Sequence, residues 1–173
     1  RSGTDGPVRA ALDEAATAAR SAAELVRQLT SITRLEPGKP PEPIEIGQAS
    51  SDVLHLLRGL VHRSIQFTGS LPEDDCWVMG RPAELHQVLF NLCLNARDAL
   101  EGVTEPQIAI DVRVRGCRVQ LEVRDNGCGM SPEVVSHLGE PFFTTKGPSQ
   151  GTGLGLATTY ATVRDMGGEI ECL

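Results

Sequence analysis

The sequence of 173 residues has few aromatic side chains, no excess of basic charge and no long apolar run. Aromatic residues make up 3% of the chain and its formal net charge is -7, so it lacks both the stacking rings and the positive field that nucleic-acid binding requires. No stretch approaches the roughly 20 apolar residues of a membrane-spanning helix, and no signal-peptide pattern opens the sequence. We therefore expect no nucleic-acid partner and no membrane contact from this segment, although a parent protein can still be membrane-anchored.

The cysteines show no pattern of pairing. They are odd in number and form no CxxC motif, at Cys76, Cys93, Cys117, Cys128 and Cys172. This usage is typical of reduced thiols in a cytoplasmic protein and does not indicate structural zinc. The 40% hydrophobic content and the length together predict one domain with a substantial core, plus an appendage.

The first part of the chain carries a heptad pattern, in which apolar positions alternate in steps of four and three. These positions are Val8, Leu12, Ala15, Ala19, Ala22, Val26, Leu29 and Thr33. They predict one long helix over residues 1–36 that pairs with another helix, although its alanines would bury little apolar area. A helix packed on its own domain is the alternative. Prolines end the helix and make residues 37–43 a linker, so the main domain is expected at residues 44–173.

Within residues 44–173 the hydrophobic periodicity predicts an α+β fold. We expect strands at residues 44–46, 64–68, 76–79, 108–114 and 119–125. We expect helices at residues 51–61, from Pro82 to residue 99, and after residue 156. A hairpin turn containing Gly69 and the acidic residues 73–75 is expected to join the second and third strands. The apolar face of the central helix is expected to consist of Leu85, Val88, Leu89, Leu92, Ala96 and Ala99.

Beside that apolar face runs a polar stripe. Asn91, Asn95 and Asp98 stand at i, i+4 and i+7, so their oxygen-bearing side chains share one side of the helix and are expected to border a cleft. Such oxygens suit Mg2+, which shares its coordination sphere with substrate phosphates and water. The alternative is that the amides only satisfy neighbouring backbone groups.

Asp125 ends a predicted strand in phase with the apolar positions before it, so its carboxylate is expected to point towards the buried side of the sheet. A buried carboxylate needs a donor, which the exocyclic amine of adenine would supply. An Asx turn that closes the strand is the alternative. Gly127 and Gly129 allow the close backbone approach of a flat base.

A second glycine cluster, at residues 151–156, precedes a helical run. Its backbone N–H groups would therefore gather at a helix N-terminus, which is a site that binds phosphate. The alternative is that these glycines only make the start of the helix more flexible. The segment of residues 139–150 is too long for a simple connection between two elements, which predicts a mobile lid. We expect Phe142 and Phe143 to anchor the base of this lid. Thr144, Thr145 and Lys146 are expected to reach a phosphate, unless Lys146 is an ordinary solvated lysine.

The segments NLCLNARD, DNGCGM, EPFFTTK and GTGLGL, in this order, resemble the N, G1, F and G2 boxes of the histidine kinase catalytic domain. The resemblance covers residues 44–172. It implies the two-layer α/β sandwich shared with gyrase, Hsp90 and MutL, whose mixed sheet is mostly antiparallel, with ATP and Mg2+ as cofactors. It also implies an ATP-dependent protein-histidine kinase, which transfers the gamma-phosphate to a histidine for relay to a response-regulator aspartate. Residues 22–34 resemble the second helix of the dimerisation and phosphotransfer hairpin, which implies a homodimer in the full-length protein and a receiver domain as partner.

Residue by residue, the resemblance implies Asn95 as a Mg2+ ligand assisted by Asn91, and Asp125 as the residue that reads adenine. Asn91 and Lys146 would be the catalytic residues. The ATP-binding residues it implies are Asn91, Asn95, Asp98, Asp125, Gly127, Gly129, Met130, Phe143, Thr144, Thr145, Lys146, Gly151, Thr152, Gly153, Leu154, Gly155 and Leu156.

The chain departs from the family pattern in three ways. None of its histidines is followed by an acidic residue, so the acceptor is missing and we expect no self-phosphorylation; they are His55, His62, His86 and His137. The sequence stops where the family continues with further strands, so a sheet edge is expected to be missing. Asn91 stands where the hydrolysing relatives have a water-activating Glu, which favours transfer over hydrolysis. The alternatives are a nucleotide-dependent interaction switch, an ATPase of the gyrase or Hsp90 type, and a serine kinase of the anti-sigma-factor type.

Overall fold

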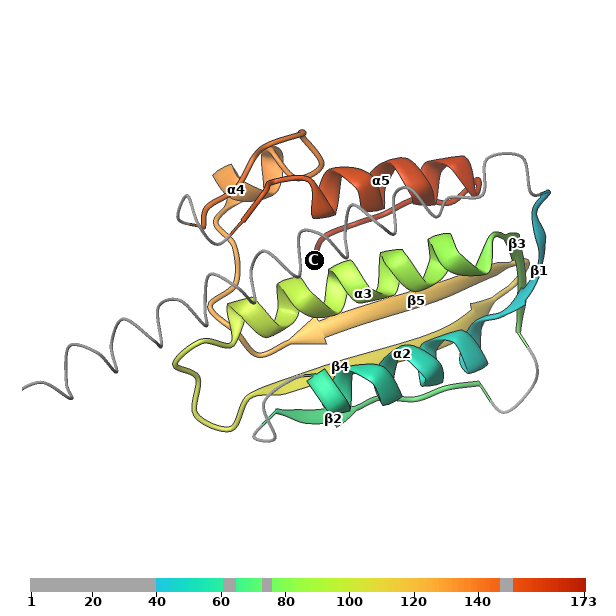
Figure 1. Ribbon diagram of the computed structural model, residues 1–173, viewed down its shortest axis with the longest axis horizontal. Helices are drawn as coiled ribbons and strands as arrows, with labels where there is room; N and C mark the ends of the chain where they lie inside the picture. Colours follow the sequence, from blue (N-terminus) through green and yellow to red (C-terminus); the bar gives the residue numbers. More distant parts are fainter. Residues whose placement is uncertain (1–39, 61–64, 73–75, 147–150) are drawn as a thin grey trace, which may run out of the picture.

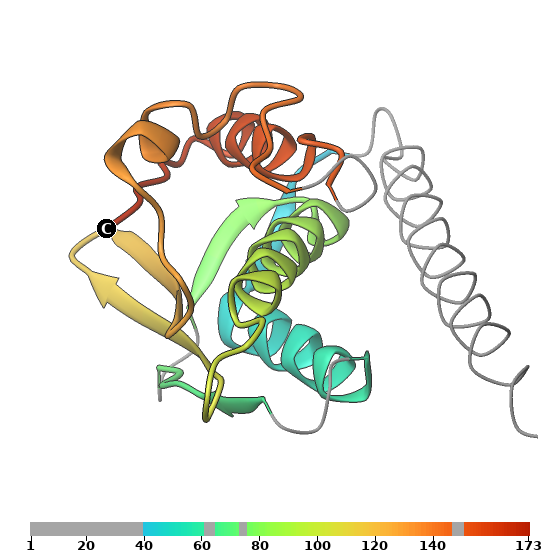
Figure 2. The same cartoon turned by 90° about the vertical axis from the view of Figure 1, so that its left-hand side faces the viewer.

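The computed structural model describes residues 40–60, 65–72, 76–146 and 151–173, which form an α+β sandwich with helices packed on one face of the sheet strands (Figures 1 and 2). The predicted helix over residues 1–36 lies outside the described residues. The elements are β1 (Glu42–Glu45), α2 (Ile46–Leu60), β2 (Gln66–Thr68), β3 (Trp77–Gly80), α3 (Pro82–Ala99), β4 (Gln107–Arg115), β5 (Arg118–Asp125), α4 (Pro132–Ser136) and α5 (Gly155–Asp165). Among the described helices, none is both long and apolar enough to cross a membrane.

The strands pair in two groups. The antiparallel strands β4 and β5 meet at a tight turn whose Gly116 has a φ of 62°, and β2 pairs parallel to β4. In the second group β1 and β3 are antiparallel. The predicted hairpin between the second and third strands is therefore wrong. The reason lies at Gly69, where a Cβ would come within 1.9 Å of the Ile110 carbonyl oxygen, so this glycine lets the chain press against β4 and does not form a hairpin turn.

The first strand and helix begin earlier than predicted. Strand β1 starts at Glu42, inside the expected linker, and α2 starts at Ile46, five residues before the expected start at 51. The Glu45 carboxylate explains the second shift, because it accepts hydrogen bonds from the N–H groups of Gly47, at 2.9 Å, and Gln48. These donors of the first helical turn would otherwise have no partner.

The core side chains come from α2, α3 and the strands, and the helices and strands lie on opposite sides of this core in Figure 2. Leu57, Leu89 and Ile110 are fully buried in it. The predicted apolar face of α3 is only partly right, because Leu92 and Ala99 are half-exposed while Cys93 and Leu94 are buried. Helix α3 contacts α2, the sheet and α5, so more than one of its sides is covered and a single apolar stripe underestimates its burial.

The outer face of β3 remains exposed. Trp77, the one tryptophan of the sequence, is 55% exposed, and Met79 is 56% exposed. Val78 between them packs against the core, as the alternation of side chains along a strand requires.

Candidate functional site

The polar stripe of α3 is divided between two environments. Asn91 is 4% exposed, and its amide nitrogen donates to the Gly155 carbonyl oxygen, at 3.1 Å, and to Thr159 Oγ1, at 3.3 Å. Its amide oxygen accepts a bond of 2.9 Å from Gln87 Nε2. The alternative interpretation, in which an amide satisfies neighbouring backbone, therefore applies to Asn91, and this residue joins α3 to the start of α5.

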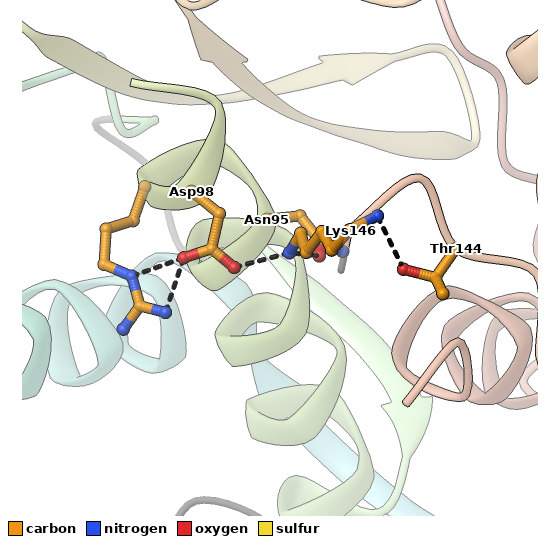
Figure 3. Close-up of polar contacts among 5 residues, drawn as sticks. Asn95, Asp98, Thr144 and Lys146 are labelled. Carbon is orange, nitrogen blue, oxygen red and sulfur yellow. Dashed lines mark hydrogen bonds and ion pairs between the residues drawn. The ribbon is translucent and has the colours of Figure 1, made fainter. Parts of the chain in front are cut away.

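The other two residues of the stripe meet a lysine from the predicted lid. Lys146 Nζ forms an ion pair with Asp98 Oδ2 and lies 3.4 Å from Asn95 Oδ1 (Figure 3). The second oxygen of Asp98 accepts bonds of 2.8 and 2.5 Å from Nε and Nη2 of Arg97. The Lys146 N–H donates to Thr144 Oγ1 at 3.1 Å. Lys146 is thus not a freely solvated lysine, since its ammonium is held against α3.

Asp125 departs from the prediction of a buried carboxylate. It pairs in register with the fully buried Ile108, so it lies on the core side of the sheet, but as the last residue of β5 it is exposed. Its Oδ1 accepts a bond of 2.9 Å from the Gly127 N–H, which is the Asx turn given as the alternative. The carboxylate is therefore solvated and turned onto its own loop.

That loop is fixed against the end of α3. A Cβ at Gly127 would lie 2.4 Å from the Ala99 carbonyl oxygen, and the Cys128 N–H donates to the same oxygen at 3.1 Å. Met130, further along the loop, is 51% exposed. The DNGCGM segment is thus anchored one residue away from Asp98, with an apolar side chain open to solvent.

The base of the predicted lid is joined to the second glycine cluster. The Phe142 N–H donates to the Gly153 carbonyl oxygen at 3.0 Å, and Gly153 has a φ of 66°, where a Cβ would lie 2.3 Å from the Phe142 backbone. Phe143 is half-buried, with its ring 5.2 Å from that of His137. The prediction that the Phe142 side chain also anchors the lid is wrong, because this side chain is 74% exposed and the backbone makes the contact instead.

Helix α5 starts at Gly155, the last glycine of this cluster and slightly before the start predicted after residue 156. Its N-cap residue Leu154 makes no side-chain cap, and the Leu154 N–H donates to Thr152 Oγ1 at 3.4 Å. Thr152, Leu154 and Leu156 are half-buried. A Cβ at Gly151 would lie 2.6 Å from Thr144 Oγ1, which brings the lid threonine to the glycine cluster. Thr145 is exposed, and residues 147–150 lie outside the described chain.

Sequence reasoning missed Thr159 and Arg97. Thr159 is 1% exposed and its hydroxyl donates to the Gly155 carbonyl oxygen at 2.9 Å, so it completes the junction with Asn91. Its place one helical turn after Gly155 was a usable signal, since a threonine at i+4 commonly bonds that carbonyl. Nothing in the spacing separated Arg97 from an ordinary surface arginine.

Segments far apart in the sequence thus converge on α3. The fold and this convergence define a nucleotide-binding domain of the ATPase type, in which a helix carrying asparagines lies between two glycine-rich turns. The chain belongs to the histidine kinase-, DNA gyrase B- and HSP90-like ATPase family, whose model matches residues 80–172. The predicted family and α+β sandwich are therefore confirmed.

Similar proteins include several sensor kinases. The two-component sensor PprA of Pseudomonas aeruginosa is 41% identical over 137 residues, which cover 74% of this chain and 14% of PprA. The sensor kinase CckA of Brucella abortus is 35% identical over 167 residues, covering 89% of this chain and 18% of CckA. Among solved structures, the catalytic domain of histidine kinase ThkA matches with a TM-score of 0.63 and 27% identity, over 74% of this chain and 82% of that one. The chain thus spans less than a fifth of the length of these two sensor proteins.

Proposed function

We propose that the chain is the ATP-binding catalytic module of a two-component sensor histidine kinase. The observation that carries this proposal is the pair of contacts from α3. Asn91 bonds the carbonyl of Gly155 at the start of α5, and Lys146 reaches Asn95 and Asp98 from the lid. Helix α3 thereby contacts both the N-terminus of α5 and the cationic side chain of Lys146. A helix N-terminus and a cationic side chain are groups that bind a polyphosphate.

The base of ATP is assigned to the DNGCGM loop. Asp125 would exchange its bond with the Gly127 N–H for the exocyclic amine of adenine, since a solvated carboxylate is free to accept it. Gly129 has a φ of 67°, and a Cβ placed on it would meet no atom of the described residues within 4 Å, which leaves room beside it for a flat ring. Met130 would supply apolar contact to the base from its exposed side chain.

The phosphates are assigned to the other end of the site. The backbone N–H groups of residues 151–156, Lys146 and the hydroxyls of Thr144 and Thr145 would donate hydrogen bonds to the phosphate oxygens. Asn95 Oδ1 suits a metal ligand, because it already faces a cation and its residue is only half-buried. Bound Mg2+ would neutralise the charge of the phosphates. Asn91 would act with Lys146 in catalysis chiefly by fixing the glycine cluster, since positioning and electrostatics dominate phosphoryl transfer.

The parts that act with this module extend beyond the described residues. We propose residues 1–36 as the second helix of the dimerisation and phosphotransfer hairpin, residues 37–41 as the linker that leads to β1, and a homodimer formed by the hairpin. The acceptor histidine would lie outside this chain, and a response regulator would take the phosphoryl group in the cytoplasm. ThkA, whose catalytic domain shares the fold, has been solved in complex with the response regulator TrrA.

Nucleotide binding is tested by calorimetry with Mg-ATP on the chain and on its Asp125→Ala variant. We expect the variant to bind about 10- to 100-fold more weakly, the range for losing a hydrogen bond to a charged group. Asp165→Ala, which removes an exposed carboxylate from the end of α5, is the matched control and should bind as the unchanged chain does. Equal affinity in the Asp125 variant would remove the support for the base pocket.

Transfer is tested separately from hydrolysis. Labelled ATP and a partner that carries the acceptor hairpin should yield acid-labile phosphate on the partner and none on the isolated chain. Glu84, which lies about two helical turns before Asn91 on α3, is ion-paired with Arg81 at 2.9 Å, which does not suit a water-activating base. Sustained phosphate release without a partner would identify an ATPase instead. Tight ATP binding without transfer would identify a nucleotide-dependent interaction switch.

A further inference from the structure

Two oxygens of α3 converge on one cation. Asn95 Oδ1 and Asp98 Oδ2 both contact the ammonium of Lys146, as Figure 3 shows. The two residues stand at i and i+3, so their side chains share one side of the helix. Arg97 holds the other Asp98 oxygen, which leaves Oδ2 to the cation. The site is only partly shielded, because the side chains of Asp98 and Lys146 are 27% and 31% exposed.

Asn91 is not equivalent to these residues. Its oxygen and its nitrogen are both engaged by protein groups, and it is 4% exposed, so a cation would have to break a buried junction to reach it. Within the described ranges, no three side chains of His, Cys, Asp and Glu gather into a metal site. A divalent cation held by this part of the chain would therefore combine few protein oxygens with phosphate oxygens, which is the usual arrangement for Mg2+.

We propose that Asn95 and Asp98 form the divalent-cation site of this module, and that the Lys146 ammonium fills it while nucleotide is absent. The proposal rests on the function proposed above and adds Asp98, in place of Asn91, as the second protein ligand. On arrival of Mg-ATP, Asn95 and Asp98 exchange the ammonium for Mg2+, and Lys146 moves to the phosphates. Because Mg2+ held by Asn95 and Asp98 would also bind the phosphate oxygens of ATP, metal and nucleotide bind cooperatively.

The experiment measures this cooperativity as a ratio. The Kd of ATP is determined by calorimetry in EDTA and again with saturating Mg2+, for the unchanged chain and for Asp98→Ala. We expect the ratio of the two Kd values to fall about tenfold in the variant, within the range typical of coupling between two ligands. The matched control is Glu101→Ala, which removes an exposed carboxylate just beyond α3 and should leave the ratio unchanged. Thermal unfolding of each variant checks that it is folded.

A second variant separates a metal ligand from a general charge effect. Lys146→Met removes the ammonium, so ATP should bind more weakly in both conditions while the ratio stays at least as large as in the unchanged chain. The proposal is overturned if Asp98→Ala leaves the ratio unchanged, which includes the case in which both Kd values shift by the same factor. It is also overturned if Lys146→Met lowers the ratio as Asp98→Ala does. In each of these cases ATP binding itself stands. If the unchanged chain takes up no ATP with Mg2+, the proposed function fails and this inference fails with it.

Discussion

The amide nitrogen of Asn91 donates a hydrogen bond of 3.1 Å to the carbonyl oxygen of Gly155, which lies 64 residues further along the chain. Thr159 donates to the same oxygen at 2.9 Å, so α3 and α5 are joined by a small buried polar network. This junction sets where α5 begins relative to the polar stripe of α3. The position of the α5 N-terminus, which we assign to phosphate binding, therefore depends on the hydrogen bond that the Asn91 side chain donates.

Removing this side chain should lower stability as well as ATP affinity. For Asn91→Ala we expect the free energy of unfolding to fall by about 1–3 kcal/mol, the range for breaking a buried hydrogen-bonding group, measured by urea denaturation. Gln87→Ala removes the half-buried partner of the Asn91 oxygen and is expected to cost less. An Asn91 variant with unchanged stability would show that α5 is held by other contacts.

Replacing Gly153 by alanine should loosen the lid from α5. At this residue the left-handed backbone alone costs an alanine about 1–2 kcal/mol, and the contact of 2.3 Å with the Phe142 backbone adds to this. Gly116→Ala is the matched control, because Gly116 has a similar φ of 62° but its Cβ position has no atom within 4 Å in the part of the chain that the structure describes. We expect the Gly153 variant to lose more stability than the control in urea denaturation and to bind ATP more weakly. Equal losses would mean that the close approach to Phe142 relaxes without cost.

Thiol labelling offers a test of the base pocket without mutation. Cys128 lies in the DNGCGM loop and is exposed, as is Cys117 at the turn between β4 and β5. Bound Mg-ATP should slow the alkylation of Cys128 and leave that of Cys117 unchanged, as followed by mass spectrometry of digested protein. Cys93 should not react in the folded state, because burial raises the pKa of its thiol to about 12 and excludes the reagent. Equal labelling of Cys128 with and without nucleotide would place the base elsewhere.

The cap of α2 predicts a pH dependence of stability. Burial tends to raise the pKa of the Glu45 carboxyl, but the N–H groups of Gln48, Gly47 and Cys76 together outweigh it, so the pKa is lowered in the folded state. A lowered pKa means that the charged form contributes stability above the unfolded-state pKa of about 4.3, and that this contribution is lost as the pH falls through the folded-state pKa.

Glu45→Gln should therefore be less stable than the unchanged chain at pH 7, with the difference shrinking as the pH falls below about 4.3. Urea denaturation over a pH series measures it. Glu42→Gln, an exposed glutamate in the same strand, is the matched control and should show no such convergence. A difference for Glu45→Gln that stays constant with pH would contradict the role of its charge.

The sequence predicted the features that depend on local pattern. The hairpin of β4 and β5, the start of α3 at Pro82 and the presence of a helix next to the second glycine cluster all follow from periodicity and turn residues, which act within a few positions. The pairing of β2 with β4 did not follow. That pairing is long-range, and it depends on Gly69 fitting against Ile110, which no local pattern records.

The same distinction holds in the site. Spacing placed Asn91, Asn95 and Asp98 on one stripe, but it did not show that α5 covers Asn91 while Asn95 and Asp98 meet Lys146. Phase also gave Asp125 the correct side of the sheet but not its exposure, because burial at a strand end depends on what packs over it. The direction of a side chain thus follows from the local sequence pattern, whereas its burial and its contacts depend on tertiary packing.

The exposed place of Trp77 on β3 has a practical consequence for spectroscopy. As the one indole of the sequence, it dominates the intrinsic emission of the protein, and it sits on the ribbon of β1 and β3, not among the residues assigned to ATP. Its fluorescence should report unfolding of that ribbon and remain silent to nucleotide. An optical probe of ligand uptake must therefore be introduced elsewhere, for which Phe143, beside His137, is a suitable position.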